Sequence, residues 1–264
     1  MRYNAAMGTN GTIDFHCHLD DPCFEKNRWQ LIDQCFACGY AKLVTVADPF
    51  NTESLEKTNE MLSYHPDIHA VIGAHPHQAD NYSPEIEKRI SAFYQKNKIL
   101  AVGEVGLDYH YNLSASDTQI TVFKRQIAIA REWSLPLVIH SRKAEEIVLK
   151  ILALEKFANP VVFHCYTGDK HAAAEILQRG YFLSFSGIIT FKNANVLREI
   201  VETTPLPQLF SETDSPYLAP EPNRGTTNTP LAARLVVEKI AEIKKTDSSI
   251  INIETIKNFQ RLGK

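Results

Sequence analysis

The chain alternates short apolar runs with longer amphipathic stretches from residue 12 to about residue 245, with no linker or change in composition between them. The short runs are rich in Val, Ile, Leu and Phe, which is typical of parallel strands buried on both faces. The longer stretches repeat their apolar residues every three or four positions, as amphipathic helices do. The pattern therefore predicts repeated strand–helix units around a parallel sheet.

This pattern predicts eight strands and eight helices that follow them. The strands are 12–18, 41–48, 68–76, 99–108, 135–142, 160–167, 181–187 and 209–216. The helices are near 25–38, 52–64, 83–97, 115–133, 143–157, 169–179, 192–203 and 230–245. The count predicts an α/β fold, a (β/α)8 TIM barrel. A doubly wound open sheet is the alternative, but it usually has a glycine-rich loop after its first strand, where this chain has HCHLDDPCF.

We expect residues 1–264 to form a single domain, with the barrel at about 12–246 and a last helix at about 253–261 outside it. The net charge of −3 provides no global basic field, so nucleic-acid binding would depend on a local patch or on metal ions that neutralise phosphate. The start, MRYNAAMGTNG, lacks the apolar core of a signal peptide, and no apolar run reaches membrane-spanning length. We therefore expect a cytoplasmic protein that does not associate with membranes.

The five cysteines are odd in number, which fits reduced thiols rather than a disulfide framework. Cys35 and Cys38 form a CxxC, but there is no second pair at zinc-site spacing. We interpret them as buried structural residues at the end of a helix, with a redox or zinc role as the alternative.

His16 and His18 stand two positions apart in the first predicted strand, TIDFHCH. Alternate side chains of a strand leave the same face, so both imidazoles point to one side. Such a pair can hold a divalent ion such as Zn²⁺, Mn²⁺ or Fe²⁺ when carboxylates complete the coordination. A pair of half-buried histidines without a ligand is the alternative that these two residues alone leave open.

The rest of the chain favours a metal site, because catalytic groups of TIM barrels lie at the carboxyl ends of the strands. The predicted strands carry the following imidazoles and carboxylates at or near these ends: His16, His18, His75, His77, Glu104, His140, His164 and Asp214. Four strand-end histidines together with Glu104 and Asp214 exceed what one tetrahedral structural zinc needs and suggest two metals bridged by a carboxylate. The remaining histidines, predicted to be surface or packing residues, are His65, His69, His110 and His171.

The chain resembles the TatD family of metal-dependent deoxyribonucleases, within the amidohydrolase superfamily, in these motifs: DFHCHLD, GAHPH, AVGEVGLDYH, LPLVIHSRKA, FHCYTG, YFLSFSGIITFK, SETDSPYLAP and NFQRL. The resemblance implies two divalent metal ions, with Mg²⁺, Mn²⁺ and Zn²⁺ all open. It implies that one ion is held by His16, His18, Glu104 and Asp214, and that Glu104 bridges to a second held by His140 and His164. It also implies that Asp214 is the general base, so Asp214 and Glu104 are the candidate catalytic residues.

The resemblance further implies hydrolysis of DNA phosphodiester bonds, with 3′→5′ exonuclease action on single strands. Glu104 stands where phosphotriesterase-like relatives have a bridging lysine, which also favours this substrate. Arg142 and Arg224 are candidate phosphate contacts, since a guanidinium binds phosphate through two hydrogen bonds; a plain surface arginine is the alternative for each. His75 and His77 are candidate substrate or water contacts, with support of the metal ligands as the alternative. We expect a monomer whose partner is single-stranded DNA.

Some positions depart from the family pattern. Lys143 replaces the usual acidic residue after the arginine of the fifth-strand motif, and the usual RGKRNEP is RGTTNTP, which places threonines at 226, 227 and 229. These changes affect the substrate grip and leave the metal ligands intact. They keep open an amidohydrolase that cleaves a small ester, lactone or amide. A non-catalytic barrel scaffold is the alternative of another class, which the presence of all six presumed ligands disfavours.

Overall fold

The computed structural model describes residues 11–263. The start MRYNAAMGTNG, which we predict not to be a signal peptide, therefore lies outside the described residues except for Gly11. The strands are β1 (Thr12–Cys17), β2 (Tyr40–Ala47), β3 (Ile68–Ile72), β4 (Ala101–Asp108), β5 (Leu137–Arg142), β6 (Val161–Phe163), β7 (Phe182–Phe185) and β8 (Leu209–Ser211). Their order in one eight-stranded sheet is the order of the sequence, β1 to β8. The fold is the predicted (β/α)8 TIM barrel.

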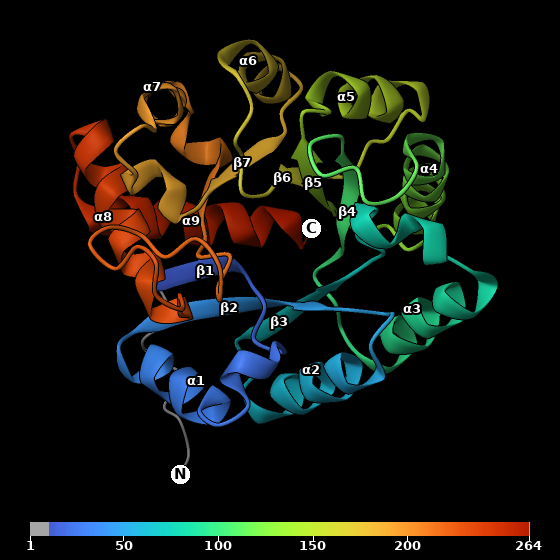
Figure 1. Cartoon of the computed structure of the whole chain (residues 1–264). Coiled ribbons are helices and arrows are strands. Elements are labelled where there is room, and N and C mark those ends of the chain that lie inside the picture. The colour runs from blue at the N-terminus through green and yellow to red at the C-terminus, as the bar shows by residue number, and fades with distance from the viewer. Residues whose placement is uncertain (1–10, 264) are drawn as a thin grey trace. The chain divides into compact units, whose positions relative to one another are not determined.

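The helices alternate with the strands, as the colour sequence of Figure 1 shows. They are α1 (Arg28–Ala37), α2 (Thr52–Tyr64), α3 (Pro84–Lys96), α4 (Ser116–Glu132), α5 (Glu145–Leu154), α6 (Lys170–Gln178), α7 (Asn195–Thr203), α8 (Ala233–Lys244) and α9 (Ser248–Leu262). Within residues 11–263, none of them is both long enough and apolar enough to cross a membrane.

Contacts divide the chain into two compact units, whose boundaries run through β2 and β7. The first unit comprises the described residues up to Thr45 and those from Ser184 onward. In it β1 and the segment after β8 lie side by side: the His18 amide donates to the Ser215 carbonyl at 2.7 Å, and the Asp214 amide donates to the His16 carbonyl at 2.9 Å. The first and last strands of the sheet therefore meet, as closure of a barrel requires.

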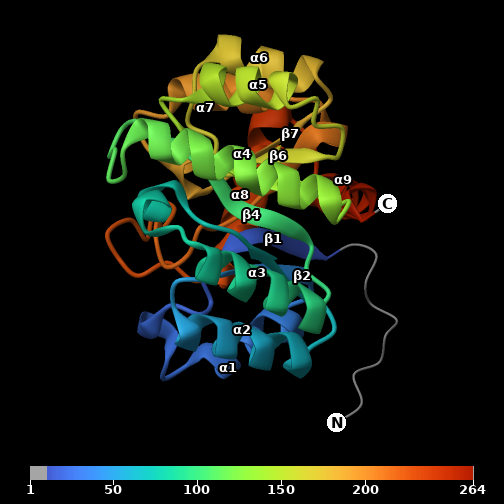
Figure 2. The same ribbon diagram turned by 90° about the vertical axis from the view of Figure 1, so that its right-hand side faces the viewer.

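The second unit comprises residues 46–183. Its strands β3 to β6 pair in parallel, with Val71 opposite Ala101, for example, and α4 runs along β4 (Figure 2). Ile90 and Phe93 of α3 are buried in a cluster with Ile72 of β3, and burying one such side chain contributes about 1.5–3 kcal/mol. This apolar contact holds α3 against the sheet.

Gly106 lets β4 approach β5 closely. Its φ is +140°, which favours glycine, and an added Cβ would lie 2.1 Å from the His140 carbonyl oxygen. Backbone contact between the two strands is therefore tight at the level of His140.

The structure corrects several predicted boundaries. β3 ends at Ile72 rather than at residue 76, because the Ala74 amide donates to the Gln126 side chain at 2.7 Å instead of to a neighbouring strand. Pro76 then opens a 3-10 helix, η2 (Pro76–Asn81). α9 begins at Ser248 rather than near residue 253, because burial of Ile251 in the core holds its first turn in place. The prediction that both cysteines of the CxxC are buried was wrong for Cys38, which is exposed, and right for Cys35.

Candidate metal centre

The first unit brings together three of the predicted ligands, His16, His18 and Asp214. His16 lies in β1, His18 directly follows it, and Asp214 lies beyond the end of β8. The Asp214 Oδ1 atom is 3.4 Å from the His18 Nε2 and 4.0 Å from the His16 Nε2. The two imidazole rings are inclined at 73° to one another, with centroids 5.2 Å apart. Two strands that meet side by side thus place a nitrogen pair and a carboxylate at one point.

A buried polar network holds Asp214 in this place. Asp14 of β1, which is fully buried, accepts hydrogen bonds from the Thr213 amide at 2.8 Å and the Thr213 hydroxyl at 2.6 Å. The Asn228 side chain donates to the carbonyls of Thr213 at 3.0 Å and Tyr217 at 2.7 Å. Asp214 itself has a φ of +55°, a conformation uncommon for a residue with a side chain. The network therefore stabilises a backbone turn that aims Asp214 at the two histidines.

The loop after His18 is fixed by a buried arginine. Arg28 is 1% exposed, and its guanidinium donates to the carbonyls of Leu19 at 2.6 Å, Asp20 at 3.2 Å and Asp21 at 3.3 Å. The planar guanidinium suits this fan of carbonyl acceptors. Arg28 therefore orders the chain that leaves the His16–His18 pair.

The second unit gathers its ligands around one carboxylate oxygen. The Oε1 atom of Glu104, in the middle of β4, lies 2.7 Å from the His164 Nε2, 2.8 Å from the His140 Nδ1 and 3.2 Å from the His75 Nε2. The Glu104 side chain is 7% exposed and that of His164 is 2% exposed. A buried carboxylate that faces several imidazole nitrogens is arranged as a ligand of a cation.

Asp108, at the end of β4, is a residue that the sequence interpretation missed. Its Oδ2 lies 2.8 Å from the His77 Nε2 and 3.1 Å from the His140 Nε2, and its Oδ1 accepts from the His110 and Tyr111 amides. Asp108 therefore orients two of the histidines. The signal was present in the motif GLDYH, in which Asp108 stands four residues after Glu104 and hence on the same face of the strand.

The pKa values of this unit reflect the same contacts. Burial lowers the pKa of His75 to about 4, although the charge of Glu104 opposes it. Burial would also lower the pKa of His140, but its hydrogen bonds to Asp108 and Glu104 raise the pKa instead. Burial acts to raise the pKa of Asp108, and the hydrogen bonds from His140, Tyr111 and His77 outweigh it and lower the pKa. Asp108 is therefore anionic at neutral pH, and the His75 imidazole is neutral.

The donor atoms of both units suit a divalent cation. The ligand atoms of His16, His18 and Asp214 lie within 4.8 Å of one another. In the second unit the Glu104 Oε1 atom lies 2.8 Å from the His140 Nδ1 and 2.7 Å from the His164 Nε2. Mixed imidazole and carboxylate groups suit Zn²⁺, Mn²⁺ or Fe²⁺, whereas Mg²⁺ prefers oxygen ligands alone.

The two predicted phosphate contacts both stack on aromatic rings. The Arg142 guanidinium carbon lies 5.0 Å from the centroid of the Tyr111 ring, and that of Arg224 lies 4.1 Å from the centroid of the Phe191 ring. Arg142 ends β5, two residues after His140, and Arg224 lies in the exposed loop that contains the threonine departures. Both arginines are held on rings rather than by carboxylates in the described part of the chain.

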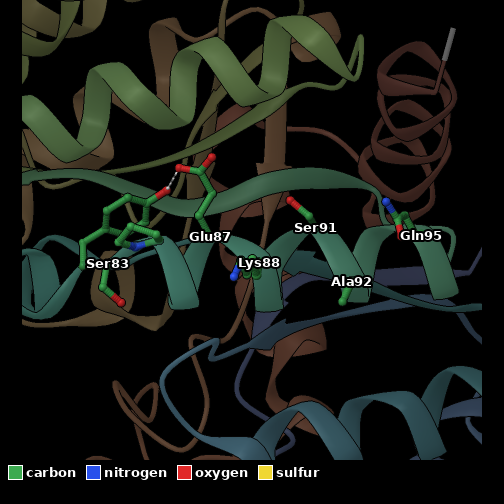
Figure 3. Close-up of a pocket in the computed structure, with 8 residues that line it drawn as sticks. Ser83, Glu87, Lys88, Ser91, Ala92 and Gln95 are labelled. Atoms are coloured by element: carbon green, nitrogen blue, oxygen red, sulfur yellow. Dashed lines mark hydrogen bonds between the residues drawn. The ribbon is translucent and has the colours of Figure 1, made fainter.

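A groove of about 640 Å³ lies along α3 (Figure 3), and no candidate metal ligand is among the residues that line it. Its lining includes Glu87, which accepts a hydrogen bond from the Tyr82 hydroxyl at 3.0 Å and is paired with Arg125. The hydrogen bonds from Arg125 lower the pKa of Glu87. The carboxylate of this groove is therefore engaged in structural contacts, and we assign the groove no catalytic role.

The chain is similar in sequence to known proteins over most of its length. A sequence model of the family described as TatD related DNase matches residues 13–264. The chain is 37% identical over 252 residues to the uncharacterized metal-dependent hydrolase YabD of Bacillus subtilis (strain 168), covering 95% of this chain and 98% of that protein. It is 35% identical over 254 residues to the uncharacterized metal-dependent hydrolase YcfH of Escherichia coli (strain K12), covering 95% and 94%.

Among solved structures, the crystal structure of YJJV, a TatD homolog from Escherichia coli K12, has a TM-score of 0.87 at 24% sequence identity and covers 95% of this chain and 97% of that one. The barrel and its groups of imidazoles and carboxylates fit the class of metal-dependent hydrolases, to which these sequence relatives are assigned. The chain belongs to the TatD family.

Proposed function

We propose that this protein hydrolyses phosphodiester bonds of DNA with two divalent ions and removes nucleotides from the 3′ ends of single strands. The observation that carries the proposal is the Glu104 Oε1 atom, which faces the His140 and His164 nitrogens at 2.8 Å and 2.7 Å. A carboxylate in this arrangement is suited to bridge two cations. Membership of a family described as TatD related DNase supports the choice of substrate.

The proposed ligands of one ion are His16, His18, Asp214 and Glu104, and those of the other are Glu104, His140 and His164. When bound, the ions would neutralise charge on the scissile phosphate and lower the pKa of the attacking water. Asp214 has a carboxylate oxygen, Oδ2, besides the Oδ1 that faces His18, and we propose that Oδ2 accepts the proton of this water. The network of Asp14, Thr213 and Asn228 keeps the carboxylate in position for that transfer.

Arg142 and Arg224 are the proposed phosphate contacts. Each guanidinium is held on an aromatic ring, which leaves its N–H groups for an oxyanion, and guanidinium and phosphate pair through two parallel hydrogen bonds. His75 and His77 are the proposed water and substrate contacts beside Glu104 and Asp108. A cytoplasmic location and a monomeric state stay predictions from the sequence.

A small ester, lactone or amide is the second candidate substrate, and the loop at 224–230 favours it. Thr226 and Thr227 are exposed there, and the Thr226 hydroxyl donates to the Asn223 carbonyl at 2.8 Å. A threonine in this role offers phosphate no positive charge. A weaker grip on a polyanion would suit a smaller substrate.

Hydrolysis of a 5′-labelled single-stranded DNA oligonucleotide tests the proposal. The protein is first stripped of metal and then titrated separately with Mg²⁺, Mn²⁺ and Zn²⁺, next to a panel of small esters and amides. We expect a ladder that shortens from the 3′ end, depends on the added ion and is absent in Asp214→Asn.

The control variant is Asp247→Asn, which changes a carboxylate at the start of α9 and should leave the ladder unchanged. An intact oligonucleotide with every ion, combined with hydrolysis of an ester or amide, would replace the proposed function with the second candidate. Full activity of Asp214→Asn would refute the assignment of the general base.

A further inference from the structure

Tyr111 is a large aromatic side chain that stays 54% exposed beside the histidines of the second unit. Its ring stands perpendicular to that of His77, with centroids 5.6 Å apart. His77 in turn lies 2.8 Å from Asp108, the carboxylate that also contacts His140. An exposed ring thus adjoins the histidine cluster directly.

Hydrogen bonds hold the backbone around Tyr111 in one conformation. The exposed ring therefore has a defined position next to the histidines. The Tyr111 amide donates to the Asp108 Oδ1 at 2.8 Å, and the His110 amide donates to the same oxygen at 2.9 Å. The Tyr109 amide donates to the Arg142 carbonyl at 3.0 Å. The strand ends that carry the candidate ligands therefore also hold Tyr111 and Arg142.

Arg142 places a positively charged guanidinium next to the Tyr111 ring. Its guanidinium carbon lies 5.0 Å from the Tyr111 ring centroid, within the range of a cation–π contact. Among residues 11–263, no carboxylate lies within salt-bridge distance of this guanidinium. The arginine is therefore positioned by the tyrosine while its charge stays available.

We propose that Tyr111 and Arg142 form a nucleotide subsite, in which a nucleobase stacks on the Tyr111 ring and the adjoining phosphate binds the Arg142 guanidinium. The inference rests on the proposed function and deepens it, because it makes the base of the substrate, and not only its phosphate, a recognised group. Stacking on an aromatic ring accepts any base, so the subsite would favour single-stranded nucleic acid without sequence preference.

Binding by the full chain tests the subsite, with Asp214→Asn as the background so that no substrate is consumed. The probes are a fluorescein-labelled oligothymidylate and an abasic oligomer with the same number of phosphates, in Mn²⁺. We expect Tyr111→Leu to weaken binding of the oligothymidylate about 5- to 150-fold, the change that corresponds to the about 1–3 kcal/mol of one stacked base. It should change binding of the abasic oligomer much less.

Two further variants separate the roles of ring and charge. Tyr111→Phe keeps the ring and should retain binding of both probes, which also shows that the loop remains folded. Arg142→Gln removes the charge and should weaken both probes. Tyr64→Leu, at another exposed tyrosine in α2, is the matched control and should bind both probes like the background.

The inference is overturned if Tyr111→Leu weakens both probes equally or neither, or if the background binds no oligothymidylate. Cleavage of the same oligothymidylate by the unsubstituted protein, measured in parallel, distinguishes the two proposals. Cleavage without a selective effect of Tyr111→Leu removes only the subsite. Selective binding without cleavage keeps the subsite and removes the proposed function.

Discussion

Both carboxylate oxygens of Asp14 bind a single residue, Thr213: Oδ1 accepts from its amide at 2.8 Å, and Oδ2 accepts from its hydroxyl at 2.6 Å. The two residues are 199 positions apart in the chain, and both are fully buried. The Thr213 hydroxyl also accepts a hydrogen bond from the Ser215 amide at 3.1 Å. Asp14 therefore fixes the residues on either side of the candidate base, Asp214.

Replacement of Asp14 by leucine should destabilise the protein, because the buried Thr213 amide and hydroxyl lose their acceptors. We expect a loss of at least about 1–3 kcal/mol in the free energy of unfolding, the usual cost of one buried unsatisfied group. Asp14→Asn keeps an acceptor for the Thr213 amide and loses only the one for the Thr213 hydroxyl, so it should cost less than Asp14→Leu. Urea denaturation of both variants measures this, and equal losses would contradict the hydrogen-bond explanation.

Asn228→Ala should reduce turnover more than it affects substrate binding. The Asn228 side chain donates to the carbonyls of Thr213 and Tyr217, so its loss frees the turn that carries Asp214. We expect kcat to fall about 10- to 100-fold, a typical effect of residues that orient metal ligands, with little change in KM. Thr227→Ala in the same exposed loop is the control, and a fall in its kcat of the same size would argue against a specific role of Asn228.

Glu104→Gln should lower the metal content of the purified protein. The substitution keeps the size of the side chain and removes the negative charge that faces His140, His164 and His75. Residues that only hydrogen-bond to metal ligands contribute up to about 100-fold in metal affinity. Because Glu104 is itself a proposed ligand, we expect the apparent affinity for Mn²⁺ or Zn²⁺ to fall by more than this. Elemental analysis after dialysis measures it. Glu146→Gln, at an exposed residue of α5, is the matched control and should retain the metal content of the unsubstituted protein.

The stability of the metal-stripped protein should fall in acid partly through His75. Burial lowers the pKa of this imidazole from 6.5 to about 4, so the unfolded chain takes up its proton at a higher pH than the folded chain. The free energy of unfolding therefore decreases as the pH falls from about 6.5 to about 4, by up to about 3 kcal/mol from this residue. Urea denaturation at several pH values in this range should show a shallower decrease in the free energy of unfolding for His75→Gln than for the unsubstituted protein. Equal slopes for the two proteins would refute the role of His75.

The repeating local pattern was enough to predict most of the fold. The helix predicted at 52–64 is α2 with the same limits, since its Asn51 cap and its apolar period are local signals. The start of α9 was misplaced, because serines such as Ser248 and Ser249 occur both in loops and at helix starts. Only the packing of residues such as Ile251 determines that a helix begins here. The end of β3 was misplaced because an apolar run does not specify which of its amides find a partner in the sheet.

For the candidate site, the sequence alone identified the imidazoles and carboxylates at the strand ends, with the exception of Asp108, because the alternation of side chains in strands is a local signal. Tertiary structure alone decided which of them touch. The contact of Asp108 with His77 joins residues 31 positions apart. The hydrogen bonds between Asp14 and Thr213 join residues 199 positions apart. Periodicity reports the face on which a residue lies, whereas a hydrogen bond depends on strand register and loop conformation, which only the packed chain sets.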